Sequence, residues 1–173
     1  MAQYGRPNGV TTVSTWYESG GSSQTNIYTA IDETTRSDTD YIYSTPDGST
    51  TTACKIGLSY LYEPSVNTGH IFRYTYLRSK TNKDATLAVR LIDSSYGTIA
   101  SWVNANPGGT FSLAEQTLTE TQAGNISDYT TLAIEFQVIV ATPGGGHIEV
   151  SWAEFQIPDG VIHNVVSNVI ANA

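Results

Sequence analysis

Residues 132–140, LAIEFQVIV, alternate between large apolar side chains and small or polar ones. The even-numbered residues from Leu132 to Val140, Phe136 among them, are all apolar and share one face, whereas Glu135 and Gln137 belong to the other face. A period of two residues is typical of a β-strand that buries one face. Because such strands occur mainly in antiparallel sheets, the segment predicts an antiparallel sheet with one face in the core.

Further segments have the length of a strand and are rich in β-branched or aromatic residues. They are residues 52–61, 70–79, 86–92 and 97–104, with weaker strand patterns at 25–31 and 40–44. Turns that contain Gly and Pro separate many of these segments, as expected for a protein built from short strands.

The apolar pattern changes phase within residues 147–157. Ile148, Val150 and Trp152 would share one face, but the apolar residues then shift to Ala153 and Phe155. A strand whose inward positions change in this way needs an extra residue. The pattern therefore predicts a β-bulge, or a strand that crosses from the face of one sheet to another.

One short interior helix is predicted near residues 119–126. Thr119 and Gln122 have the spacing of a capping box, in which each side chain bonds to the backbone of the other residue. Together with the strands, this predicts an all-β fold. We expect an antiparallel β-sandwich of the jelly-roll type with extended or helical terminal arms.

A chain of 173 residues corresponds to one domain. We expect an N-terminal arm or first strand over residues 1–20, a β-sandwich over 21–158 and a C-terminal tail over 159–173. The tail carries an apolar stripe at helical spacing, which needs a surface on the chain's own domain or on a neighbouring subunit. This stripe consists of Val161, Ile162, Val165, Val166, Val169 and Ile170.

The net charge is −8, from 8 Lys and Arg against 16 Asp and Glu. Because binding to a nucleic-acid backbone requires a basic stripe, we expect no nucleic-acid partner, and the acidity also disfavours an anionic membrane surface. The longest purely apolar run, residues 138–141, is far shorter than the ~20 residues of a membrane span. Residues 1–7 contain no apolar segment, so we expect no secretory signal and synthesis in a cytoplasm.

No residue set matches a catalytic or cofactor-binding motif. The histidines His70, His147 and His163 lie far apart in the sequence, and we expect the first two at the surface or at strand ends. The patterns HExxH and GxSxG do not occur. The single cysteine, Cys54, cannot form an intrachain disulfide and fits a small core residue. We therefore predict a protein that is not an enzyme and that has no catalytic residue, no metal and no cofactor.

The sequence contains one candidate calcium site, in an acidic loop. Asp32, Glu33, Asp38 and Asp40 lie within nine residues, and oxygen-rich loops of this kind can bind Ca²⁺. The spacing is not that of an EF-hand. A solvated loop whose charge is partly offset by Arg36 is the better interpretation.

Two rows of aromatic residues are candidates for a sugar-binding site. Tyr41 and Tyr43 share one face of a predicted strand, and Phe72, Tyr74 and Tyr76 share one face of another. Such rows can stack on sugar rings. They can also pack in a core or between subunits, with their hydroxyl groups at a solvent-exposed edge.

Five regions of the sequence, in this order, resemble small structural proteins encoded in the genomes of tailed bacteriophages. They are TAIDE at 29–33 with DTDYI at 38–42, GHIFRY at 69–74, TIASW at 98–102, LTETQA at 118–123 with ISDY at 126–129, and VSWAEFQIP at 150–158. The resemblance covers roughly residues 25–158.

The resemblance implies a non-enzymatic virion protein, and the size of the chain is most similar to that of a capsid decoration or cement protein. Such proteins commonly sit as trimers on the outside of an icosahedral head, so the implied partners are the major capsid protein and the other copies in a homotrimer. For interfaces we single out Tyr4, Arg6 and Trp16, together with the apolar stripe of the tail.

Two other functions stay open. One is a different phage part, such as a tail, neck or fibre domain that recognises a cell-surface glycan through exposed Tyr and Trp. The other is a free carbohydrate-binding module or a jelly-roll enzyme, which would need a cleft lined by convergent polar groups.

Overall fold

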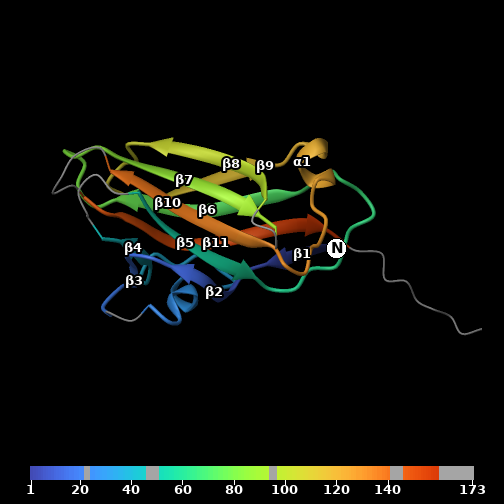
Figure 1. Cartoon of the computed structure of the whole chain (residues 1–173), viewed down its shortest axis with the longest axis horizontal. Coiled ribbons are helices and arrows are strands. Elements are labelled where there is room, and N and C mark those ends of the chain that lie inside the picture. The colour runs from blue at the N-terminus through green and yellow to red at the C-terminus, as the bar shows by residue number, and fades with distance from the viewer. Residues whose placement is uncertain (22–23, 46–50, 94–96, 141–145, 160–173) are drawn as a thin grey trace, which may run out of the picture.

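The computed structural model describes residues 1–21, 24–45, 51–93, 97–140 and 146–159, which form two antiparallel sheets (Figure 1). The six-stranded sheet has the order β3 (Trp16–Glu18), β4 (Ile42–Ser44), β11 (Ile148–Pro158), β6 (Ile71–Arg78) and β9 (Ser112–Thr117), with β1 (Ala2–Gly5) also paired to β11. The five-stranded sheet has the order β2 (Pro7–Val13), β5 (Thr51–Leu58), β10 (Ala133–Val140), β7 (Ala85–Ile92) and β8 (Thr98–Ala105). The predicted all-β antiparallel sandwich is confirmed.

Strand β10 lies at the centre of the five-stranded sheet, between β5 and β7. Its inward side chains Ile134, Phe136 and Val138 are all 0% exposed, as the alternation predicts. The outward Glu135 is buried as well, because Arg90 and Lys55 on the neighbouring strands lie beside it and form ion pairs with its carboxylate. The strand predicted from residues 132–140 is therefore confirmed, and its outer face is covered by long side chains.

Strand β11 contains the predicted β-bulge. Its pairing with β6 shifts register between Val150 and Trp152. Val150 points into the core before the shift, and Phe155 points into the core after it, both at 0% exposure. The extra residue thus lets one strand keep apolar side chains inside along both halves.

The two helical segments show one correct and one wrong prediction. The α-helix α1 (Glu120–Gly124) begins after Thr119, and both capping-box hydrogen bonds between Thr119 and Gln122 are present. Residues 25–31, in contrast, do not form a strand. They contain the 3₁₀-helix η1 (Ile27–Ala30), because Ile27 and Ala30, three residues apart, both turn toward the core.

The N-terminal segment joins both sheets. Strand β1 pairs with β11, β2 pairs with β5, and β3 pairs with β4. Residues 160–173, which carry the predicted apolar stripe, lie outside the described residues. Among the described residues, no helix is long and apolar enough to cross a membrane.

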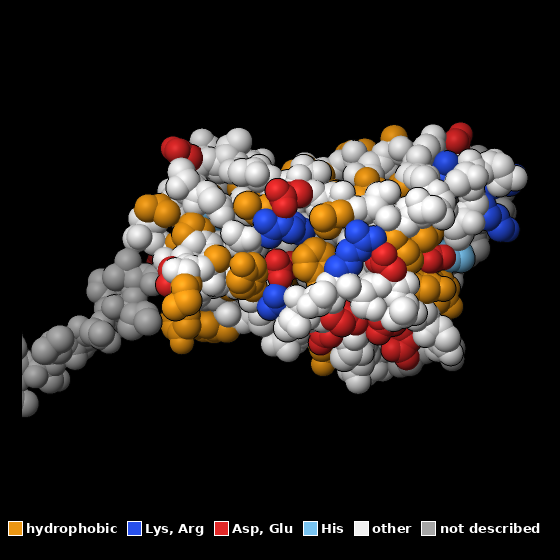
Figure 2. All heavy atoms as spheres, turned by 180° about the vertical axis from the view of Figure 1, so that it is seen from behind, with side chains coloured by type: hydrophobic (Ala, Val, Ile, Leu, Met, Phe, Trp, Pro, Cys, Tyr) orange, Lys and Arg blue, Asp and Glu red, His pale blue; other side chains and the backbone are white. Residues whose placement is uncertain are grey.

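The outer face of the six-stranded sheet is crossed by an ion-pair network (Figure 2). Arg6 Nη2 lies 2.5 Å from Glu154 Oε2, and Arg73 lies between Glu154 and Glu115 at 3.5 and 2.6 Å. The side chain of Glu154 is only 7% exposed, so it depends on these two guanidinium groups for its charge compensation.

Two isoleucines on β10 test whether the inner face carries the stability of the fold. We expect Ile134→Ala to lower the free energy of unfolding by about 2–5 kcal/mol, because it leaves a cavity in the core. The matched control Ile139→Ala, at a side chain 47% exposed, should cost less than about 1 kcal/mol. Urea unfolding measures both, and equal losses would contradict the assignment of the two faces.

Candidate functional site

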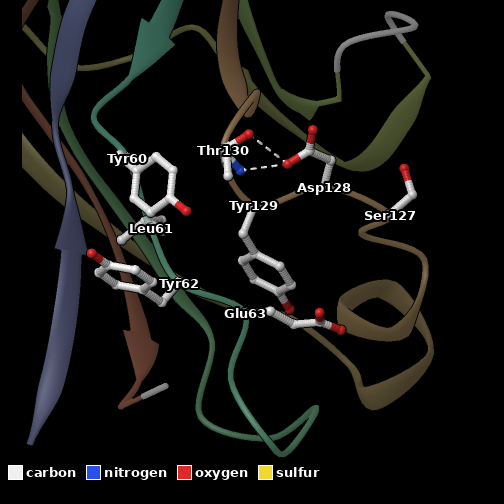
Figure 3. A pocket seen from close by; sticks show the side chains of 8 residues that line it. All are labelled: Tyr60, Leu61, Tyr62, Glu63, Ser127, Asp128, Tyr129 and Thr130. Atoms are coloured by element: carbon white, nitrogen blue, oxygen red, sulfur yellow. Dashed lines mark hydrogen bonds between the residues drawn. The ribbon is translucent and has the colours of Figure 1, made fainter. Parts of the chain in front are cut away.

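A hollow of about 230 Å³ opens at one end of the sandwich (Figure 3). Two segments line it, the loop that follows β5 and the segment between α1 and β10. The lining residues are Tyr60, Leu61, Tyr62, Glu63, Ser127, Asp128, Tyr129 and Thr130.

Two exposed tyrosines form one wall of the hollow. Tyr60 is 60% exposed and Tyr62 is 66% exposed, whereas Leu61 between them is 1% exposed. The alternation turns Leu61 into the core and both rings outward, as in an extended strand. The ring centroids are 4.9 Å apart in an edge-to-face arrangement.

The N-terminal segment holds this wall in its extended form. Gln3 Nε2 donates to the carbonyl oxygen of Tyr62 at 2.9 Å, and the N–H of Tyr62 donates to Gln3 Oε1 at 2.8 Å. Leu61 packs so closely on Gly5 that a Cβ there would lie 2.8 Å from Leu61 Cδ1. The tyrosine wall is therefore attached to β1, which is itself paired with β11.

Asp128 and Thr130 stand on the opposite wall (Figure 3). Asp128 Oδ1 accepts hydrogen bonds from the backbone N–H of Thr130 at 2.8 Å and from its hydroxyl at 2.7 Å. These bonds lower the pKa of Asp128 below its usual value, with the hydroxyl bond contributing most. The carboxylate is therefore ionised at neutral pH. Glu63 adds a second, exposed carboxyl group from the loop after β5.

Tyr129 and His70 form a buried pair beneath the hollow. Tyr129 is 5% exposed, and its hydroxyl lies 2.8 Å from Nε2 of His70, which is 0% exposed. Burial, with a smaller effect from the charge of Glu63, raises the pKa of Tyr129 to about 12. Burial also lowers the pKa of His70. Both groups are consequently neutral at pH 7, and the bottom of the hollow carries no charge of its own.

The structure separates the residues that were singled out for interfaces. Tyr4 is 43% exposed, and the guanidinium of Arg6 lies 5.3 Å from the centre of its ring. Trp16 is 0% exposed and packs on Phe136, so it belongs to the core and offers no surface for an interface. The apolar stripe at Val161–Ile170 lies outside the described residues.

The aromatic rows have different positions. Phe72 and Tyr74 are 0% exposed, so the interpretation of this row as core is confirmed for them. Tyr41 and Tyr43 lie on the outer face of the six-stranded sheet in a partly buried cluster. This cluster, the outer-face aromatic cluster, contains Tyr17, Tyr41, Tyr43, Phe111 and His147.

The other candidates for chemistry are accounted for by the fold. Cys54 is 0% exposed in β5, and burial raises the pKa of its thiol, so its predicted core position is confirmed. His70 lies directly before β6, so of the two expected positions it has the strand end, and it is fully buried there. In the acidic loop, Asp38 bonds to Arg36 and Ser151. Within the described residues, no three His, Cys, Asp or Glu side chains gather closely enough to hold a metal.

The sequence analysis missed the tyrosine wall. Local alternation gave no signal for it, because continuing the pattern of residues 52–58 would place Tyr60 and Tyr62 in the core, whereas the phase reverses after Leu58 and Leu61 is the buried residue. Tyr60 was treated as part of the predicted strand 52–61, and Tyr62 as part of the connection. The observed strand β5 ends at Leu58, which moves both rings to the end of the sandwich.

Several solved structures match the structure of this chain. SGBP-B from a xyloglucan utilization locus of Bacteroides uniformis matches 84% of this chain with a TM-score of 0.51 and 10% identity. An arabinose-bound α-L-arabinofuranosidase, MgGH51, matches 82% with a TM-score of 0.51 and 7% identity. Tailspike protein 4 of bacteriophage CBA120, in its enzymatically active domain, matches 89% with a TM-score of 0.45 and 13% identity.

Carbohydrate-binding modules are also among the matched structures. The present chain spans 46%, 23% and 19% of the three proteins named above, less than half of each. The two matches with a TM-score of 0.51, to SGBP-B and the arabinofuranosidase, show a similarity of fold alone. No protein-family model matches the sequence, and no curated protein matches it by sequence.

The buried His70 predicts a dependence of stability on pH. Because burial lowers its pKa in the folded protein, the unfolded chain, with a pKa near 6.5, takes up the proton first. The free energy of unfolding should therefore fall as the pH drops below about 6.5, by at most about 1.4 kcal/mol per pH unit from this group. His70→Gln should flatten this slope in urea unfolding between pH 7.5 and 5.5. Equal slopes in the wild type and the variant would contradict the prediction.

Proposed function

We propose that this protein is a non-catalytic glycan-binding β-sandwich module, with the hollow beside Tyr60 and Tyr62 as its binding site. The observation that carries the proposal is the pair of tyrosine rings, 60% and 66% exposed, fixed on the rim of a hollow that also contains carboxylate and hydroxyl groups. This is the glycan-recognition alternative among the functions considered from the sequence.

The tyrosine wall supports the proposal because two large rings remain in water at a rigid position. An aromatic ring has an apolar face and, in tyrosine, a polar tip, which suits a ligand that is apolar on one side and hydroxylated at its edge. A sugar ring has this character. Leu61 and Gln3 fix the rings before a ligand arrives, so binding loses little conformational freedom.

The opposite wall supports the proposal because it supplies oriented polar groups. Asp128 is held by Thr130, and Glu63 stands at the end of the tyrosine wall. Ligand sites commonly combine aromatic surface with a few placed polar groups that determine orientation. The eight lining residues provide both.

A binding role fits the carboxyl groups better than a catalytic one. A glycosidase of the usual kind needs two carboxyl groups, one of which acts as a general acid through a raised pKa. In this hollow the pKa of Asp128 is shifted downward, which opposes that role. Its ionised form suits hydrogen bonding to the hydroxyl groups of a sugar.

The place of the protein in a phage particle remains a prediction from the resemblance. A glycan-binding module would fit a tail or fibre position, where a virion contacts a cell surface. Capsid decoration, the homotrimer and the major capsid protein as partner also remain predictions, since they depend on surfaces beyond the hollow.

The test is binding to an array of neutral, amino and acidic oligosaccharides, followed by calorimetry on the ligands that bind. We expect Tyr60→Ala and Tyr62→Ala each to weaken binding by about tenfold or more, because central aromatic residues dominate such contacts. Both variants should keep the wild-type urea midpoint, since both rings are exposed.

Tyr41→Ala is the matched control, because Tyr41 is a partly exposed tyrosine in the outer-face aromatic cluster. It should bind as the wild type does. No binding on the array, or unchanged binding by the Tyr60 and Tyr62 variants, would reject the proposal. Loss of binding in Tyr41→Ala alone would move the site to the outer face of the sheet.

A further inference from the structure

We infer that the hollow selects glycans by charge, binding rings with amino groups most tightly, neutral rings less tightly and rings with carboxylate or sulfate groups least. This inference rests on the proposed glycan-binding function and names the class of sugar that the site takes. It follows from which hydrogen-bonding groups at the hollow are already used by the protein and which remain for a ligand.

The acceptors at the hollow are the two carboxyl groups. Both hydrogen bonds from Thr130 go to Asp128 Oδ1, and a carboxylate can accept further hydrogen bonds from a ligand. Glu63 is exposed and makes no ion pair within the described part of the chain. Carboxylate oxygens can accept hydrogen bonds only, so they require a ligand that donates.

Some donors at the hollow are occupied by the protein, and those that remain on Tyr60, Tyr62 and Ser127 are neutral hydroxyl groups. The N–H and hydroxyl of Thr130 both bond to Asp128, and the N–H of Tyr62 bonds to Gln3. The hydroxyl of Tyr129 is paired with His70 below. An anionic group on a sugar would therefore meet two carboxylates and only neutral donors, so its lost hydration would be replaced only in part.

No basic side chain offsets this imbalance. None of the eight described lining residues is Lys or Arg. The nearby Arg6 is held in the ion pair with Glu154. Lys80 and Lys83 follow the far end of β6, whose eight residues span about 26 Å, well beyond the ~10 Å over which salt at 0.1 M screens a surface charge.

An ammonium group, in contrast, would find an acceptor on each wall. It carries three donors and one positive charge, which suit the carboxylate of either Asp128 or Glu63. Hydroxyl groups of a neutral sugar can donate to the same oxygens without the charge. We therefore expect the affinity to decrease from amino sugars to neutral sugars to acidic sugars.

Three probes with one backbone test the inference: cello-oligosaccharides, their 2-amino counterparts (chitosan oligosaccharides) and their 6-carboxyl counterparts. Chemical-shift titration of the full chain, at 20 mM and at 1 M NaCl, gives the dissociation constants. At low salt we expect the amino form to bind at least about fivefold more tightly than the acidic form. The difference should nearly vanish at 1 M salt, where the screening length is about 3 Å.

Glu63→Gln and Asp128→Asn are the variants that report on the cause. Both keep the shape of the side chain, and the amide oxygen that Asp128→Asn introduces can still accept the bonds from Thr130. Each should reduce the preference for amino over acidic sugar by about two- to threefold at low salt, and the double variant should abolish it. Glu18→Gln removes the same charge from β3, at the other end of the sandwich (Figure 1), and should leave the preference unchanged.

The outcomes separate this inference from the function on which it rests. Equal binding of the three probes, tightest binding of the acidic probe, or an equal effect of Glu18→Gln would overturn charge selection while leaving a glycan-binding site at the tyrosine wall. If none of the three probes shifts the signals of Tyr60 and Tyr62, the inference and the proposed site are both overturned.

Discussion

The register shift in β11 between Val150 and Trp152 is the constraint on which the sandwich depends. This strand pairs with β1, β4 and β6, so it holds the N-terminal strand and both halves of the six-stranded sheet together. Without the extra residue, the alternation would turn Glu154 into the core and Phe155 out of it. With it, Phe155 is buried at 0% exposure and Glu154 lies on the outer face, between Arg6 and Arg73.

The same strand supports the proposed site at a distance. Strand β1 pairs with β11 from Ala2 to Gly5, and Gln3 of β1 holds the backbone of Tyr62 through two hydrogen bonds. Gly5 allows Leu61 to come close enough to bury its side chain. The exposure of the two tyrosine rings is therefore a consequence of how β1 and the loop after β5 are anchored, and the hollow is formed before any ligand binds.

Most basic groups of the molecule are engaged within the protein, whereas the hollow keeps two carboxyl groups without a basic neighbour in its described lining. Six of the eight Lys and Arg are engaged on the sheets and loops: five form ion pairs, and Arg78 donates to backbone carbonyls of the loops beside it. Glu63 and Asp128 remain at the hollow, where no described lining residue is basic. A ligand at this end consequently meets an excess of negative charge, although the face shown in Figure 2 has acidic and basic groups side by side.

The sequence predicted the parts of this structure that depend on local patterns. Alternation identified β10, the change of phase identified the bulge in β11, and the capping box identified α1. These predictions succeed because a strand that buries one face and a helix with its cap are both specified by neighbouring residues. The prediction of a strand at 25–31 was wrong, because Ile27 and Ala30 both turn toward the core from one 3₁₀-helix, and the local pattern does not show this packing.

By itself, the sequence determined the fold class, the inward faces of the strands and the scarcity of basic residues. Only the tertiary structure decided the site. Tyr60 and Tyr62 looked like the end of a strand and its connection, and nothing near them in sequence shows that Gln3 would hold them or that Asp128 would face them. Trp16 and Tyr60 are both aromatic residues in polar surroundings in the sequence, yet one is 0% exposed and the other 60%. The physical reason is that exposure depends on contacts between segments far apart in the chain, which alternation along one segment does not contain.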